Sequence, residues 1–313
     1  MRQNYKPILA AVVLSMVLLA GCTQLPGKAD NNWELIGENE VRQDLGTALQ
    51  QDLGEAAAGL EQTVEDSAIK LSEHIITKGI SKKLSAAKEV GSSTVLSINN
   101  PVGTIEVKPA SGNQIIVNTT IWFDNNSNHE ADRQEIMDNA EVSIQLNGDK
   151  ITASTHVKNN PKKDLWTWAQ DKFDYSNFSI DYSIEVPESV DMYQITNNVG
   201  EVQLHDLQGT YRIVSNVGAV KISGAAFTGK STVESNTGSI HLDIADMKAK
   251  SSLKVKTDIG SISASLAKSL QCSLEIESEL GVINGAEDGK SEINGGGPLI
   301  SLSSSIGAIT IDN

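Results

Sequence analysis

The chain has 313 residues, and its 40 Asp and Glu side chains outnumber its 25 Lys and Arg, so the formal net charge is −15. This acidic surplus repels nucleic-acid phosphates, and no basic stretch is interleaved with aromatic side chains, so the sequence predicts no nucleic-acid partner. Only 4 Phe, 4 Trp and 5 Tyr are present. We therefore expect a core built from Val, Ile, Leu and Ala.

Residues 1–21 are typical of a secretory signal peptide. Arg2 and Lys6 precede an apolar run over residues 8–19, which is short for a membrane span and is followed by Ala, Gly and Cys22. This ending resembles the lipobox of bacterial lipoproteins, which implies that Cys22 is acylated and becomes the mature N-terminus. The alternative is an uncleaved apolar helix that happens to end in Cys. The lipobox reading predicts a lipid anchor at Cys22 on the extracytoplasmic face of a bacterial cell membrane.

Residues 22–44 are polar and lack periodicity, and they predict a flexible tether. Residues 45–90 predict an amphipathic helical segment, a stalk with one apolar face. That face is formed by Leu45, Leu49, Leu53, Leu60, Val64, Leu71 and Ile75. Its basic end would either touch anionic lipid or pack on the domain that follows, and it carries Lys78, Lys82, Lys83 and Lys88.

A glycine-centred repeat dominates the C-terminal part of the chain. The segment 198–204 (Asn-Val-Gly-Glu-Val-Gln-Leu) recurs at 216–222 and 236–242, and weaker copies follow. The repeat glycines are spaced by 18, 20, 22, 21 and 26 residues, and a seventh similar corner precedes them. The corner glycines are Gly103, Gly200, Gly218, Gly238, Gly260, Gly281 and Gly307.

Equivalent positions of the repeat share their chemistry. An apolar β-branched residue stands two positions after each glycine from Gly200 onward, and small polar residues stand three positions before it. No single repeat can bury its apolar side alone, so stacking must supply the core. The pattern predicts an all-β fold in which residues 188–313 form a β-solenoid of about six to seven rungs. Its last strand, at residues 309–313, would leave an open edge that could support self-association.

Residues 91–187 predict a strand and hairpin cap region, an α+β elaboration before the repeats. We expect strands over 95–98, 115–123 and 178–186, and a short helix over 129–140. A hairpin is expected over 142–157, because Asn147-Gly148 separates two alternating runs.

Residues 91–313 resemble a bacterial family of putative adhesins with β-strand repeats, largely a domain of unknown function. The resemblance rests on the strand that ends in Val186-Pro187-Glu188 and on the recurrent Asn-x-Gly-x-(Val/Ile)-x-(Leu/Ile) turns. It implies a right-handed parallel β-helix-like fold, a surface location and no known active site.

Few residues carry recognisable chemistry. The sequence lacks Gly-x-Ser-x-Gly, Cys-x-x-Cys and His-Glu-x-x-His, and His205 and His241 fall in different columns of the repeat, so we predict no catalytic residue, no metal and no cofactor. Cys272 is expected to be a small buried hydrophobe. Asp206 and Asp243 fall near one another in register, with Glu201 and Asp246 nearby. They leave open a polysaccharide-active enzyme.

The segment after Val157 predicts a loop with a candidate contact surface. It gathers scarce aromatic side chains beside Lys162 and Lys163, namely Trp166, Trp168, Phe173 and Tyr175. Such rings could bind envelope polysaccharide or a surface protein, or they could plug the end of the solenoid as a cap.

The sequence therefore predicts a membrane-anchored surface lipoprotein whose non-catalytic, adhesin-like solenoid binds or scaffolds at the cell envelope. Two alternatives are a polysaccharide-active β-helix enzyme and an envelope-stress regulatory module that acts through a protein partner.

Overall fold

The computed structural model describes residues 79–123 and 127–313. The expected signal peptide, the tether and residues 45–78 of the helical segment lie outside these ranges. Within them, strands dominate and only two α-helices occur, α3 (Glu130–Asp138) and α4 (Leu165–Phe173). The expected all-β class is confirmed.

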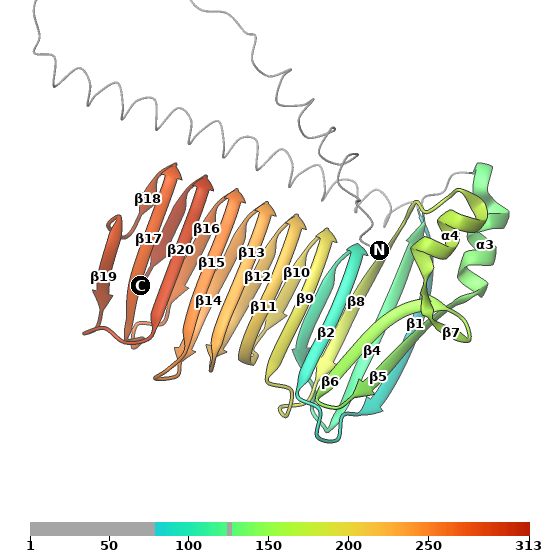
Figure 1. The fold of residues 1–313 in the computed structure, drawn as a ribbon, viewed down its shortest axis with the longest axis horizontal. Coiled ribbons are helices and arrows are strands. Elements are labelled where there is room, and N and C mark those ends of the chain that lie inside the picture. Colours follow the sequence, from blue (N-terminus) through green and yellow to red (C-terminus); the bar gives the residue numbers. More distant parts are fainter. Residues whose placement is uncertain (1–78, 124–126) are drawn as a thin grey trace, which may run out of the picture. The chain divides into compact units, whose positions relative to one another are not determined.

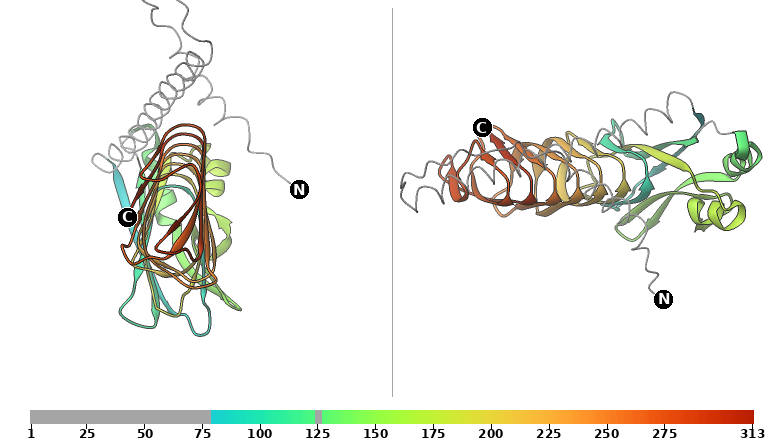
Figure 2. Two further views of the ribbon diagram at one scale, coloured as in Figure 1. Left: turned by 90° about the vertical axis from the view of Figure 1, so that its left-hand side faces the viewer. Right: turned by 90° about the horizontal axis from the view of Figure 1, so that it is seen from above.

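The repeats form two rows of parallel strands (Figure 1). Row one contains, in spatial order, β2 (Val95–Val102), β9 (Met192–Val199), β11 (Gln208–Val217), β13 (Lys230–Thr237), β15 (Ser252–Ile259), β20 (Leu299–Ile306) and β17 (Cys272–Leu280). Row two contains β3 (Ile105–Pro109), β10 (Val202–His205), β12 (Val220–Phe227), β14 (Ile240–Met247), β16 (Ile262–Leu266), β21 (Ile309–Asp312) and β18 (Ile283–Asn284). The chain passes from row one to row two at each corner glycine, and the end-on view of Figure 2 shows these turns superimposed.

The spatial order of the last two turns differs from their order in the sequence. β20 lies between β15 and β17, with Leu302 paired to Val255 on one side and to Ile276 on the other. The outer edge of β17 is occupied by β19 (Gly289–Ile293) in antiparallel pairing, so only its inner edge can accept β20. Likewise β21 lies between β16 and β18. The expectation that residues 309–313 form an open edge is therefore wrong.

The corners depend on a close approach between backbones. At Gly218 φ is +125°, and a Cβ there would overlap the carbonyl oxygen of Gly200. The same stacking joins the other corner glycines in the spatial order 103, 200, 218, 238, 260, 307 and 281. Several of the small polar residues three positions earlier donate to these carbonyls, as Asn197 Nδ2 does to Gly103 at 3.0 Å. Space thus requires glycine at all seven corners, and a positive φ adds a conformational requirement at every corner except Gly281.

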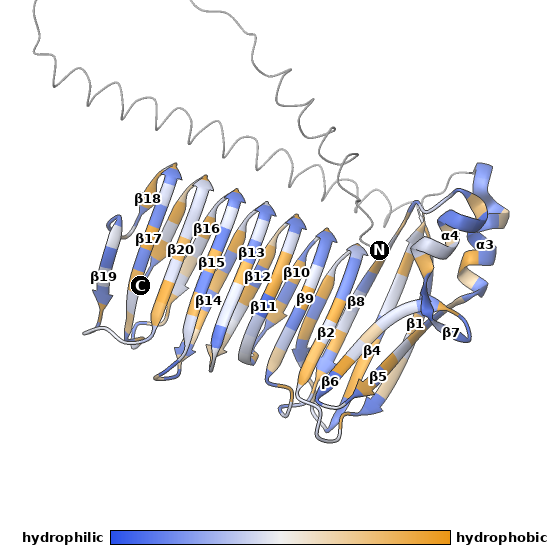
Figure 3. Cartoon of the chain, viewed as in Figure 1, coloured by the Kyte–Doolittle hydropathy of each residue, from blue (hydrophilic) through white to orange (hydrophobic). Residues whose placement is uncertain are grey.

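Inward-facing columns form one continuous core, and hydrophobic and hydrophilic residues alternate along the strands in Figure 3. The expectation of a purely aliphatic core is incomplete. Tyr193, Tyr211 and Phe227 form a buried ladder with ring centroids 5.3 and 4.8 Å apart. The two phenols donate to the carbonyls of Val190 and Leu207, which satisfies the hydroxyl groups inside the core.

The expected helix over residues 45–90 is wrong at its C-terminal end. Residues Ile80–Glu89 form strand β1, which pairs antiparallel along the whole of β4 (Gln114–Phe123). Alternate side chains of β1, such as Leu84 and Ala86, pack against the core. Two of the lysines that suggested a basic helix end, Lys82 and Lys88, instead reach across the cap and donate to the carbonyls of Met137 and Ile144, the latter at 3.1 Å.

The cap region contains the expected strands, helix and hairpin. After η1 (Ser127–His129) and α3 come β5 (Ala140–Asn147) and β6 (Lys150–Val157), whose register pairs Asn147 with Lys150 across the turn. β8 (Phe178–Val186) joins the cap to the stack, because it pairs antiparallel with β4 and parallel with β3. The predicted loop after Val157 is wrong, since that segment forms β7 (Asn160–Asp164) and α4.

We expect Gly218→Ala to lower the free energy of unfolding by about 3 kcal/mol, because it adds both backbone strain and overlap with Gly200. Gly148→Ala separates the two effects, since φ is +62° but nothing lies within 4 Å, and should cost about 1 kcal/mol. Gly112→Ala, with open space and no positive φ, should change stability by less than about 0.5 kcal/mol. Chemical denaturation measures all three, and equal losses would contradict the stacking requirement.

Candidate functional site

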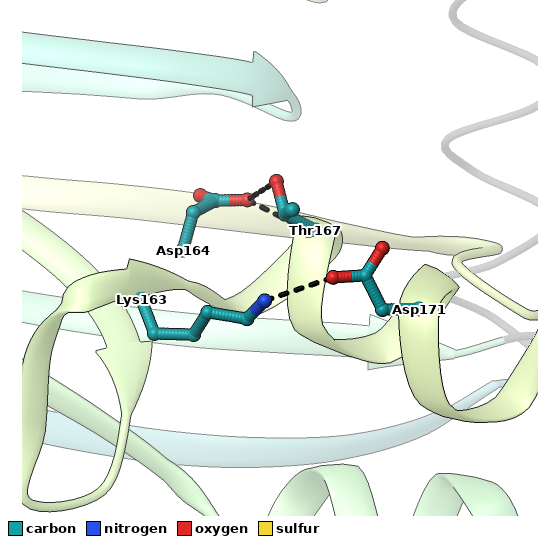
Figure 4. Close-up of polar contacts among 4 residues, drawn as sticks. All are labelled: Lys163, Asp164, Thr167 and Asp171. Atoms are coloured by element: carbon teal, nitrogen blue, oxygen red, sulfur yellow. Dashed lines mark hydrogen bonds and ion pairs between the residues drawn. The ribbon is translucent and has the colours of Figure 1, made fainter.

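The candidate contact surface is built around α4, and polar contacts fix where this helix begins. The Asp164 side chain accepts from the Thr167 backbone N–H at 2.9 Å and from its hydroxyl at 3.1 Å (Figure 4). Lys163 and Asp171 form an ion pair at 2.8 Å across the first turns. The Asp164 cap fixes the start of the helix, and burial of Leu165 and Ala169 supplies the packing that a nine-residue helix needs.

The four aromatic side chains of the segment fall into two environments. Trp166 is half-buried, stacks on Phe178 at 5.2 Å and donates its Nε1–H to the Phe178 carbonyl at 3.1 Å. Tyr175 is buried and stacks on His129 at 4.3 Å. These two rings pack on the cap. Trp168 and Phe173 also contact the core, but they meet each other edge to face at 5.5 Å and remain partly exposed.

A basic side chain covers the outer pair of rings. Lys172 Nζ lies 5.3 Å from the Trp168 ring centroid and 5.1 Å from that of Phe173, and it forms an ion pair with Glu135 of α3. Cation–π contacts at exposed sites contribute about 0.5–1 kcal/mol each. The cluster formed by Trp168, Lys172 and Phe173 thus combines exposed ring area with a hydrogen-bond donor, the composition expected of a surface that contacts sugar or protein.

Asp181 was not among the residues predicted to be functional, yet it organises the first corner. Its carboxylate accepts the Thr104 backbone N–H at 2.8 Å and the Trp122 Nε1–H at 2.7 Å. Burial raises the pKa of Asp181 and outweighs these two hydrogen bonds, which lower it. The carboxyl group is therefore held beside Gly103 by the fold, where burial penalises its charged form. Its place on the alternating strand 178–186 gave no signal of this contact.

The acidic residues singled out in the repeats are partly brought together. Asp243 Oδ2 accepts the Gly224 N–H at 3.1 Å, and the Asp206 carboxylate lies against the same glycine. Glu201 and Asp246 are each engaged with a lysine, at 2.7 Å from Lys221 and 2.8 Å from Lys248 respectively. The hydrogen bond from Lys248 lowers the pKa of Asp246.

The remaining reactive side chains lie apart from one another. Cys272 is fully buried, and burial raises the pKa of its thiol, so the neutral form is favoured. In the ladders His205 pairs with Ser223 and His241 with Lys221, which places the two imidazoles in different positions. Within residues 79–123 and 127–313, no group of three or more His, Cys, Asp and Glu has the arrangement to hold a metal ion.

Comparison with known proteins gives only distant likenesses. No family model and no curated protein matches the chain. A putative cell adhesion protein from Clostridium sporogenes is 11% identical, with a TM-score of 0.39, over 74% of this chain and 99% of that one. A putative adhesin from Bacteroides fragilis is 13% identical, with a TM-score of 0.27, over 74% and 97% of the two chains. A putative lipid binding protein from Parabacteroides distasonis is 12% identical, with a TM-score of 0.26, over 75% and 99%.

Replacing single tryptophans separates packing from contact. We expect Trp166→Ala to lower the free energy of unfolding by about 3 kcal/mol, because it removes a packed ring and orphans the Phe178 carbonyl. Trp168→Ala should cost less, about 1–2 kcal/mol, because its partly exposed ring meets Phe173 edge to face, whereas Trp166 stacks on Phe178. Thermal unfolding of both variants measures the difference. Equal losses would show that both rings serve the cap.

Proposed function

We propose that the protein is a lipid-anchored surface protein of the bacterial envelope, in which a non-catalytic, right-handed parallel β-helix-like solenoid binds or scaffolds an extended partner. The two rows of in-register parallel strands and the stacked corner glycines support the solenoid description. The handedness follows the resemblance to adhesins with β-strand repeats.

One observation carries the binding role. A single row of aligned polar side chains crosses the sheet from β1 to β18, and each member is at least partly exposed. We call it the polar row. In spatial order it contains Ser85, Asn118, Ser183, Glu106, Gln203, Lys221, His241, Ser263, Thr310 and Asn284.

The polar row is pre-organised. Ser85 donates to Asn118 at 2.8 Å, and Ser183 donates to Glu106 at 2.9 Å. Neighbouring strands lie about 4.8 Å apart, so the row offers hydrogen-bonding groups at regular intervals on a stiff sheet. Such an array suits a partner that runs across the strands and contacts many of them at once, such as an envelope polysaccharide or an extended surface protein. Little entropy is lost when a rigid surface binds.

The membrane is the second proposed partner, through the acylated Cys22. A diacylglycerol group with a further acyl chain binds bilayers stably, because each buried methylene contributes about 0.8 kcal/mol. In the part of the chain that the structure describes, neither helix has the length and apolar character needed to cross a membrane.

Cys22→Ala tests the anchor. We expect this variant to leave the membrane fraction and appear in the soluble fraction after cell lysis, while the unsubstituted protein stays with membranes and enters the detergent phase. Cys272→Ala is the matched control and should remain in the membrane fraction. Membrane retention of Cys22→Ala would contradict the anchor.

Binding to isolated envelope polysaccharide tests the role of the polar row. We expect saturable binding without release of new reducing ends, and weakening of about tenfold when Gln203 and His241 are both changed to Ala. Thr232→Ala, on the outward face of row one, is the control. Release of reducing ends would instead favour the enzyme and direct attention to Asp206 and Asp243. Absence of binding would favour a protein partner, including a regulatory one.

A further inference from the structure

A second column along the corners is apolar. The residue directly before each corner glycine is Val, Ile or Leu at six of the seven corners, and Thr at the other. We call this column the corner ridge. In spatial order it contains Val102, Val199, Val217, Thr237, Ile259, Ile306 and Leu280.

The corner ridge is accessible. Leu280 is 39% exposed, and the other members are partly exposed rather than buried. The column beside it is polar, since Asn236 donates to Asn216 at 3.1 Å and Asn216 donates to Asn198 at 2.9 Å. Seven aligned rungs at about 4.8 Å spacing give the ridge a length of about 29 Å. A mainly apolar strip of this length, interrupted only at Thr237, beside an amide ladder indicates a surface that another element covers.

The described chain begins beside one end of the ridge. A Cβ at Gly103 would overlap the Ile180 carbonyl, so the first corner lies against β8. Ile180 is paired with Ile121 of β4, and Ile121 with Lys82 of β1. The start of β1 at Ile80 is therefore at the same end of the sheet as the corners, and only β4 and β8 separate β1 from β3. At about 4.8 Å per strand, Ile80 lies within about 15 Å of the first corner of the ridge.

The segment that precedes β1 has the pattern and length to cover the ridge. Its apolar positions, from Leu45 to Ile75, fall on one face at a helical period. The part from Leu53 to Ile75 would be about 33 Å long as a helix, which matches the ridge. Isolated helices gain most of their stability from packing an amphipathic face, so this segment needs a surface to dock on.

We propose that residues 45–78 form a helix that lies along the corner ridge, with its apolar face on Val199, Val217, Ile259 and Ile306. This inference does not depend on the lipid anchor or on the ligand of the polar row. It makes the segment an integral part of the folded domain and covers one edge of the stack, while both outward sheet faces stay free.

Hydrogen exchange of the full-length chain, followed by mass spectrometry, tests the inference. We expect amides within 45–78 to be protected, and the double variant Val217→Lys, Ile259→Lys to speed their exchange by about tenfold or more. Val214→Lys is the matched control, since Val214 lies on the same strand with 38% exposure, three residues before the ridge position Val217. It should leave the segment protected.

A reciprocal change guards against simple unfolding of the β-strands. Leu60→Lys with Leu71→Lys should release the segment to the same extent without altering the ridge, whereas Gln62→Lys, on the opposite helical face, should not. Exchange within 45–78 that is equal in all variants would overturn the proposal. A ridge variant that only changes a dimer to a monomer in sedimentation would also overturn it, and would assign the ridge to a second copy of the chain.

Discussion

The contact between successive glycines at the corners is the constraint on which the fold depends. Each corner brings its backbone against the carbonyl oxygen of the neighbouring turn, so that Gly218 sits on Gly200 and Gly238 on Gly218. This contact fixes the register of both rows at once, because the strands on either side of the corner must then align with their neighbours. Every aligned column follows from it, including the apolar core, the polar row and the corner ridge.

Because the strands are aligned in register, equivalent residues of the repeat lie side by side and form surfaces of similar chemistry. On the sheet face, one position of each strand is polar from Ser85 to Asn284, and at the corners one position is apolar from Val102 to Leu280 except at Thr237. In an irregular fold such residues would be scattered and would not indicate a binding surface, since single exposed apolar side chains are normal. Here the alignment joins these residues into long surfaces that run across the strands. The α4 cluster is different, because it is formed by a local helix at the end of the stack.

Much of this fold could be predicted from the sequence, and the exceptions have physical causes. The columns around Gly200, Gly218 and Gly238 predicted the aligned strands, since each column demands one environment. Spacing along the chain carries no information on which edge a strand joins, so the position of β20 was missed. The Tyr193 and Tyr211 ladder did leave a signal, because both stand seven residues before a corner glycine. At α4, Asp164 is a residue type that favours a helix N-cap, but the nine residues that follow are too few to show a helical period of apolar side chains. Of the candidate site, the aromatic residues were found and Asp181 was not.

The insertion of β20 also constrains how the chain can fold as it is synthesised. The turns up to β16 can add in order, each on the edge left by the one before. β17 and β18 are made before β20 and β21 but lie outside them, so they cannot dock directly on β15 and β16 in the native arrangement. The growing edge must therefore wait until β20 and β21 have been made, and the last two turns of the stack close together. Strand-by-strand addition during synthesis therefore stops at β16. The outermost turn, formed by β17 and β18, can join the stack only when β20 and β21 pair with it.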